Sequence, residues 1–113
     1  MESTLTPLNA ENLYTQELVI DPEHGQIVVL RPVTVGGVRD TERSIRFFSS
    51  LNIRFRGAPQ VVNFEIPAGS LSQAVEKWLE TATRAGQEAI EQMESNYVKS
   101  RLQVPAAARM PVN

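Results

Sequence analysis

The stretch SLSQAVEKWLETATRAGQEAIEQMESNYVKSRL, residues 70–102, decides the fold of this chain. Placed at 100° steps, its apolar and small side chains fall in one stripe about 140° wide, as in an amphipathic helix. Ser70, with Gln73 three residues later, has the spacing of a capping box at a helix N-terminus. The sequence therefore predicts one helix of about 30 residues. The stripe consists of Leu71, Val75, Trp78, Leu79, Ala82, Ala85, Gly86, Ala89, Ile90, Met93 and Tyr97.

The predicted helix is longer than the strands on which it would pack. At 1.5 Å per residue it spans about 45 Å, whereas strands of six to eight residues span only about 20–27 Å. One sheet therefore should not cover the whole stripe. Either the helix breaks near Gly86 into two shorter pieces, or its second half packs on another copy of the chain.

The stripe changes character along its length. Trp78 and Leu79 are bulky and suit the face of a sheet, and Trp78 is interpreted as a core anchor or, alternatively, an interface hot spot. The residues that follow are small and would let another backbone approach closely, although Gly86 could instead mark a kink. The predicted self-association residues are Trp78, Ala82, Ala85, Gly86, Ala89, Ile90, Met93 and Tyr97.

Upstream of the helix, the pattern is that of β-strands. Residues 14–21 form the first plausible strand, and Pro22–Gly25 has the residue types of a hairpin turn. Residues 26–34 follow as a β-branched strand in which Pro32 marks an edge or a bulge. The last strand runs from Gln60 to Ile66, where Pro67 ends it.

The segment between these strands, residues 42–56, is ambiguous. Apolar residues alternate with arginines in both of its halves, but Phe48-Ser49-Ser50 interrupts the alternation. One long bulged strand and two strands with a tight turn at Ser49-Ser50 both fit.

The predicted fold class is therefore α+β, with an antiparallel sheet of about four strands followed by one long C-terminal amphipathic helix packed on one face. The predicted organisation is an N-terminal arm (1–13), a single domain (14–102) and an extended tail (103–113). A Pro/Ala-rich tail of this kind is expected to be ordered only where it lies across a neighbouring surface.

Composition excludes several classes of protein. The chain has 113 residues, 42% of them hydrophobic and 21% charged, so it should fold as one domain. It has no cysteine and one histidine, which excludes disulfide frameworks, thiolate zinc sites and cysteine nucleophiles. A net charge of −2 argues against a protein that holds nucleic acid by bulk charge. The start of the chain has no secretory signal pattern, and its longest apolar run has four residues, so we expect a cytoplasmic protein without membrane contact.

The charges are nevertheless segregated along the chain. Residues 31–56 contain six arginines and two acidic residues, whereas residues 57–98 contain six glutamates and two basic residues. We expect a basic sheet and an acidic outer face on the helix. Arg54 and Arg56 should project from one strand face, and Arg46 should point away from the core in the same way.

A row of arginines on an open sheet face can follow a phosphate backbone. In its element order, and through Arg46, Arg54 and Arg56, the chain resembles the family of small transcriptional coactivators that bind single-stranded DNA, although no motif of that family is matched. The resemblance implies a nucleic-acid-binding sheet. The candidate residues for an anion or nucleic acid are Arg43, Arg46, Arg54 and Arg56, with Phe48 as the main stacking candidate. Arginines on a solvated strand face also protect a sheet edge, or meet an acidic protein surface.

We find no pattern that points to catalysis. His24 lies in a turn beside Glu23, with no nucleophile placed by spacing, so a solvated turn histidine is the preferred interpretation. Asp21, Glu23 and His24 are too few for a calcium or zinc site. Phosphate-binding and nucleophile-elbow motifs are absent from the sequence. We expect no enzyme activity, no cofactor and no metal.

The sequence thus favours a non-enzymatic interaction protein that self-associates into a homo-oligomer and acts as an assembly, adaptor or inhibitor subunit on a larger protein partner. The alternative is a protein that binds single-stranded nucleic acid or a nucleotide with an arginine-lined sheet face.

Overall fold

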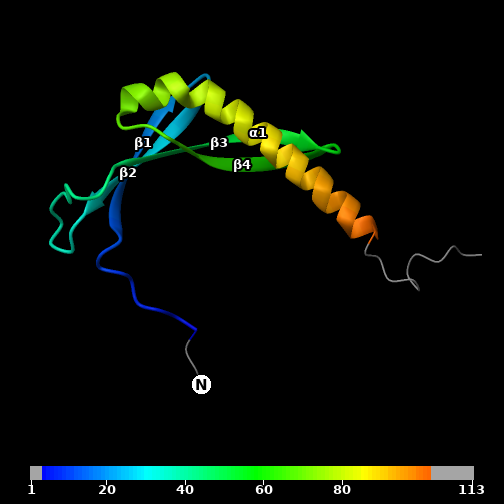
Figure 1. Cartoon of the computed structure of the whole chain (residues 1–113). Helices are drawn as coiled ribbons and strands as arrows, with labels where there is room; N and C mark the ends of the chain where they lie inside the picture. Colours follow the sequence, from blue (N-terminus) through cyan, green and yellow to red (C-terminus); the bar gives the residue numbers. More distant parts are fainter. Residues whose placement is uncertain (1–3, 103–113) are drawn as a thin grey trace, which may run out of the picture.

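The computed structural model describes residues 4–102. A four-stranded antiparallel sheet is followed by one long helix, which confirms the predicted α+β class (Figure 1). The elements are β1 (Leu13–Asp21), β2 (Gly25–Val33), β3 (Arg46–Phe55), β4 (Ala58–Ile66) and α1 (Leu71–Leu102). The predicted tail at 103–113 lies outside the described residues, and the predicted division into arm, domain and tail stays a prediction.

The sheet consists of two hairpins that overlap only in part. β1 pairs with β2 along nine positions, from Leu13↔Val33 to Asp21↔Gly25, and β3 pairs with β4 along nine positions, from Phe47↔Ile66 to Phe55↔Ala58. In contrast, β2 and β3 pair only at residues 28–30 with 46–48. The two hairpins diverge from this short junction, and their tips point in different directions (Figure 1).

Residues 46–55 form one strand, so the alternative of two strands with a turn at Ser49-Ser50 is wrong. The β3–β4 register runs without a bulge. The alternation is misleading because Ser49 points into the core, where it is 5% exposed, and Phe48 points to the opposite face. Ser49 is tolerated there because its hydroxyl donates to the Gln26 carbonyl and accepts from the indole N–H of Trp78.

α1 is one unbroken helix of 32 residues, which confirms the predicted long helix, so the alternative of a break near Gly86 is wrong. Its start follows the predicted pattern, because the Gln73 amide donates to Ser70 Oγ at 3.2 Å. The Gln73 side chain reaches back to the amide of Gly69 at 2.8 Å, one residue earlier than a capping box requires.

α1 crosses one face of the sheet along β3 and β4. Its buried residues are Ala74, Ala82 and Gly86, all in its first half. The core beneath them consists of Ile27, Val29, Phe47, Phe64, Ile66, Ala74 and Ala82. The other face of the sheet has no layer over it among the described residues.

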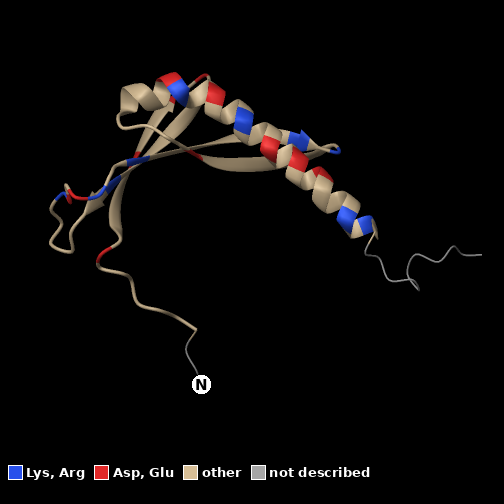
Figure 2. Cartoon of the chain, in the orientation of Figure 1, with Lys and Arg blue, Asp and Glu red and all other residues tan. Residues whose placement is uncertain are grey.

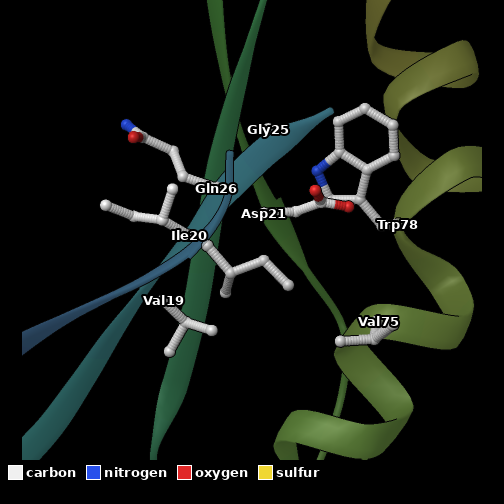
Figure 3. A pocket seen from close by; sticks show the side chains of 8 residues that line it. Val19, Ile20, Asp21, Gly25, Gln26, Val75 and Trp78 are labelled. Atoms are coloured by element: carbon white, nitrogen blue, oxygen red, sulfur yellow. The ribbon is translucent and has the colours of Figure 1, made fainter. Parts of the chain in front are cut away.

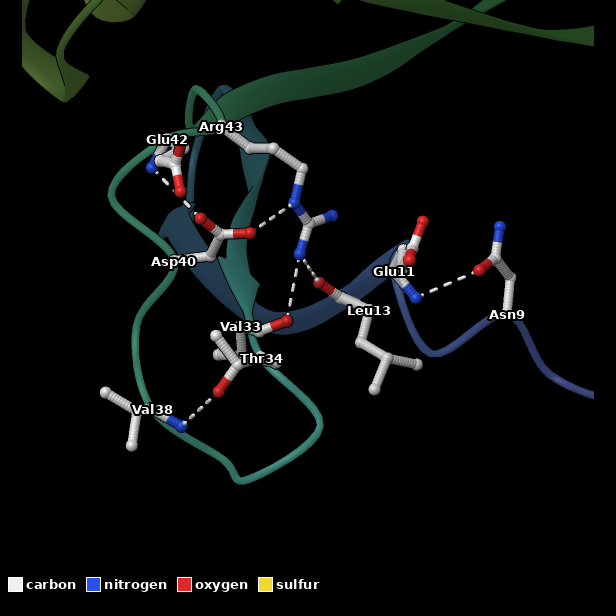
Figure 4. Close-up of polar contacts among 9 residues, drawn as sticks. All are labelled: Asn9, Glu11, Leu13, Val33, Thr34, Val38, Asp40, Glu42 and Arg43. Carbon is white, nitrogen blue, oxygen red and sulfur yellow. Dashed lines mark hydrogen bonds and ion pairs between the residues drawn. The ribbon is translucent and has the colours of Figure 1, made fainter.

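A long loop between β2 and β3 is fixed by Arg43 (Figure 4). Its guanidinium donates to Asp40 Oδ2 at 2.8 Å and to the carbonyls of Leu13 and Val33 at 3.0 and 2.9 Å. It also stacks on the Tyr14 ring at 4.9 Å. The hydrogen bond from Arg43 holds the pKa of Asp40 below its usual value. Arg43 therefore joins the loop to the start of β1, and its place among the anion candidates stays a prediction.

Candidate interaction surface

The helix contacts its own sheet with the small residues that were expected to meet another helix. Ala82 is 4% exposed, and a side-chain carbon at Gly86 would lie 3.4 Å from Leu51 Cδ1 of β3. These two residues are therefore covered by the chain's own sheet, and their assignment to self-association stays a prediction. Small side chains permit close approach of any backbone, and here that backbone is the sheet of the same chain.

Trp78 anchors the first half of α1. Its indole N–H donates to Ser49 Oγ at 2.8 Å, and its ring lies 6.4 Å from the Phe64 ring in a tilted arrangement. A side-chain carbon at Gly25 would lie 3.6 Å from the same indole. Trp78 thus holds α1, β3 and the start of β2 together at the point where the β2–β3 ladder ends, as the core-anchor interpretation predicts.

One side of α1 remains uncovered. Val75, Leu79 and Ile90 lie within about 60° of one another at 100° per residue. They are 59%, 70% and 40% exposed. We call these three residues the helix flank. It lies on the β2 side of α1, because Val75 faces β1 and β2 across a groove, whereas Ala85 and Glu88 lie on the β4 side.

Beside the helix flank lies an apolar groove of about 240 Å³ (Figure 3). Val75 and Trp78 line it from α1, and Val19, Ile20 and Ile27 line it from the β1–β2 hairpin. Of these, Ile20 is 56% exposed although it is fully apolar. An exposed apolar groove that continues into an exposed apolar helix flank is the kind of surface at which proteins associate.

A second hollow, of about 520 Å³, separates the tip of the β1–β2 hairpin from β3. We call it the hairpin hollow. Residues 20–26 line one side, residues 50–52 line the other, and Trp78 lies between them. Beyond Phe48, no strand within residues 4–102 pairs with the β2-facing edge of β3. This edge is therefore free to hydrogen-bond with water or with a further strand.

A clamp at the β3–β4 tip, formed by Arg56, joins the second half of α1 to the sheet. Arg56 Nη2 lies 3.1 Å from Glu94 Oε1, and its guanidinium stacks 3.7 Å from the centre of the Tyr97 ring. Arg56 adopts a left-handed backbone conformation, with φ of 53°, in the turn after β3. This turn sends its side chain to the helix side of the sheet.

The predicted arginine row is therefore broken. Arg56 lies across the sheet from Arg46 and Arg54, because strand alternation stops at the turn that follows Phe55. Arg46 forms a two-pronged ion pair with Glu65 at 2.8 and 2.9 Å, which lowers the pKa of Glu65. Arg54 remains on the open face and donates to the Gly57 carbonyl at 2.9 Å. The expectation that Arg54 and Arg56 share a face is wrong.

The other predicted self-association residues differ in solvent exposure. Ala85, Ala89, Met93 and Tyr97 are half-buried along the sheet-facing side of α1, and Ile90 belongs to the exposed helix flank. Val75 and Leu79 belong to the predicted stripe but not to the predicted self-association residues, and both are more exposed than Ile90. The available signal was their place on the stripe beside the small residues that contact the sheet.

The turn histidine is paired locally. His24 Nδ1 lies 2.8 Å from Asp21 Oδ2, and this hydrogen bond holds the pKa of Asp21 below its usual value. Within the described range, no three side chains that could bind a metal come together. The one helix described, α1, is not apolar enough to cross a membrane.

Comparisons of the chain with protein-family models, with curated proteins and with solved structures found no match. Function is therefore inferred from the geometry of the helix flank, the grooves and the open face.

Proposed function

We propose that this chain is a non-enzymatic interaction protein that self-associates through the helix flank and acts as an assembly, adaptor or inhibitor subunit on a larger partner. The observation that carries the proposal is the exposure of Val75, Leu79 and Ile90 beside an apolar groove. Burying such side chains against a second copy stabilises association by roughly 25 cal/mol per Å² of apolar surface.

The test is a sedimentation comparison of the unmodified chain with Leu79→Glu. A carboxylate at position 79 stays solvated in the monomer, because Leu79 is 70% exposed, but it would be desolvated in an interface. We expect the unmodified chain to be a homo-oligomer and Leu79→Glu to be a monomer with an unchanged circular dichroism spectrum. Ser95→Glu, on the exposed outer side of α1, is the matched control and should leave the oligomer intact.

A second candidate function is binding of single-stranded nucleic acid, and a specific observation favours it. The face of the sheet opposite α1 has no described covering layer and carries Arg54 together with Phe48, Asn52 and Asn63. Phe48 is only half-buried, and Arg46 stacks on it at 4.9 Å. A stacking ring next to a guanidinium suits an unpaired base and its phosphate. Glu65, which neutralises Arg46, weakens this candidate.

An oligonucleotide titration at two salt concentrations tests this second function. If it is correct, affinity falls steeply with salt, and Arg54→Ala weakens binding while Arg39→Ala, in the β2–β3 loop, changes it less. Absence of binding near physiological salt would exclude it.

A further inference from the structure

The free edge of β3 defines how two copies would meet, and this inference rests on the proposed self-association. β3 extends past the end of β2, so its edge from about Asn52 to Phe55 has no partner strand among residues 4–102. We infer that this edge pairs antiparallel with the same edge of a second copy, which joins the two sheets through β3.

Strand alternation restricts the register of this pairing. Residues opposite each other in an antiparallel pair point to the same face, so only even shifts keep core-facing residues together. A two-fold axis at Ile53 satisfies this rule. It places Asn52 of one copy opposite Arg54 of the second copy on the open face, and Leu51 opposite Phe55 on the helix side.

The same axis brings the two helices together. α1 runs along β3 in the same direction, because Trp78 contacts Ser49, Gly86 lies over Leu51, and Glu94 meets Arg56. Since α1 packs on both β3 and β4, it lies about one strand spacing from the axis, so the two helices would be about 10 Å apart. Packed helices lie at such distances. Ile90 would then sit near the axis, and Leu79 would face the Tyr97 region of the second copy.

The distribution of charge provides an independent reason to infer that the β3 edge pairs with a second copy of the chain. The β3–β4 tip carries Arg54 and Arg56, whereas the β1–β2 tip, which borders the hairpin hollow, carries Asp21 and Glu23 (Figure 2). In the inferred pairing, the basic β3–β4 tip of each copy enters the hairpin hollow of the other copy. There it lies beside that copy's acidic β1–β2 tip. Such complementarity selects the orientation of association.

The two outer edges of the sheet, along β1 and along β4, do not provide this fit. α1 contacts β3 and β4, so pairing through β1 would leave Ile90 exposed and would keep the basic and acidic tips apart. Pairing through β4 would bring together the sides of the two helices that carry Ala85 and Glu88, and would leave the helix flank on the β2 side exposed. Pairing through β3 covers the edge, the helix flank and the hairpin hollow together.

The test uses cysteines, because the chain has none of its own. In a variant with Asn52→Cys and Arg54→Cys, each new thiol faces the other position of the second copy, at a Cβ separation of about 4.5–5.5 Å. A small adjustment brings this within disulfide reach. Mild oxidation should convert this variant into a covalent dimer. The matched control, Val61→Cys with Asn63→Cys on the same face of β4, should stay uncrosslinked.

A second measurement does not depend on disulfide geometry. Glu23→Lys should weaken dimerisation about tenfold, whereas Glu88→Lys, on the β4 side of α1, should leave it within about twofold. A dimer that forms no cross-link at positions 52 and 54 and is unaffected by Glu23→Lys overturns the β3 pairing but leaves association through the helix flank. A chain that sediments as a monomer overturns both.

Discussion

The two halves of α1 have the same amphipathic pattern but different surroundings. Residues 71–86 contain every buried residue of the helix, and Trp78 fastens them to Ser49. Residues 87–102 contain no buried residue and are held to the sheet through Arg56, which contacts Glu94 and Tyr97. One apolar stripe is thus partly covered by the molecule's own sheet, at Ala74, Ala82 and Gly86, and partly left in water, at the helix flank.

The largest expected effect comes from removing the aromatic ring in each half. Trp78→Ala should lower the free energy of unfolding by about 3 kcal/mol, because it leaves a cavity against Phe64 and removes the indole N–H that donates to the Ser49 hydroxyl. Tyr97→Ala should cost less than half of this. Urea denaturation followed by circular dichroism measures both, and equal losses would show that the two halves are equally integrated.

Substitutions in the helix flank should affect association more than stability. Ile90→Glu should lower the unfolding free energy of the monomer by about 1 kcal/mol at most, because Ile90 is 40% exposed. It should nevertheless weaken association about thirtyfold, the loss typical of an interface hot spot worth about 2 kcal/mol. Sedimentation equilibrium over a dilution series gives the association constant. Undiminished association would place the interface elsewhere.

The clamp at the β3–β4 tip allows the second half to be loosened selectively. Arg56→Ala should destabilise the fold by about 1 kcal/mol, through loss of the stacking on Tyr97 and of a solvent-exposed ion pair with Glu94. Amide hydrogen exchange should rise in residues 94–102 and stay unchanged around Trp78. Uniformly increased exchange would mean that α1 opens as a single unit.

The smallest effect is expected from acid below the ordinary carboxyl pKa, where Asp40 protonates far from α1. The pKa of Asp40 is lower in the folded chain than in the unfolded chain, so its contribution to stability is present above its unfolded pKa and is lost as pH falls through the folded value. Melting temperature should drop by a few degrees as the carboxylate protonates. Arg43→Gln should flatten this dependence, because the cause of the pKa shift is gone.

Local patterns in the sequence predict much of this fold. The cap at Ser70, the turn at residues 22–25 and the stripe of α1 depend on neighbours in the chain, and each is found where predicted. The inward position of Ser49 was not predictable, because its buried hydroxyl depends on two partners distant in the sequence, the carbonyl of Gln26 and the indole N–H of Trp78. The side to which Arg56 points depends on one left-handed turn residue, which alternation does not encode.

The candidate site was predictable only in outline. The stripe indicated that α1 exceeds what one sheet covers, but not which residues stay exposed. Ala82 and Gly86 were assigned to a partner because small size indicates close packing without indicating against what. Val75 and Leu79 were overlooked because a helical wheel does not show how a helix is rotated on its sheet.

The mass of the unmodified chain in solution decides whether the helix flank is an association surface. Light scattering across the micromolar range should report a species of at least twice the 12.6 kDa monomer, and that species should dissociate on dilution. A constant mass of 12.6 kDa throughout that range would show that the helix flank stays in water and that the chain does not self-associate.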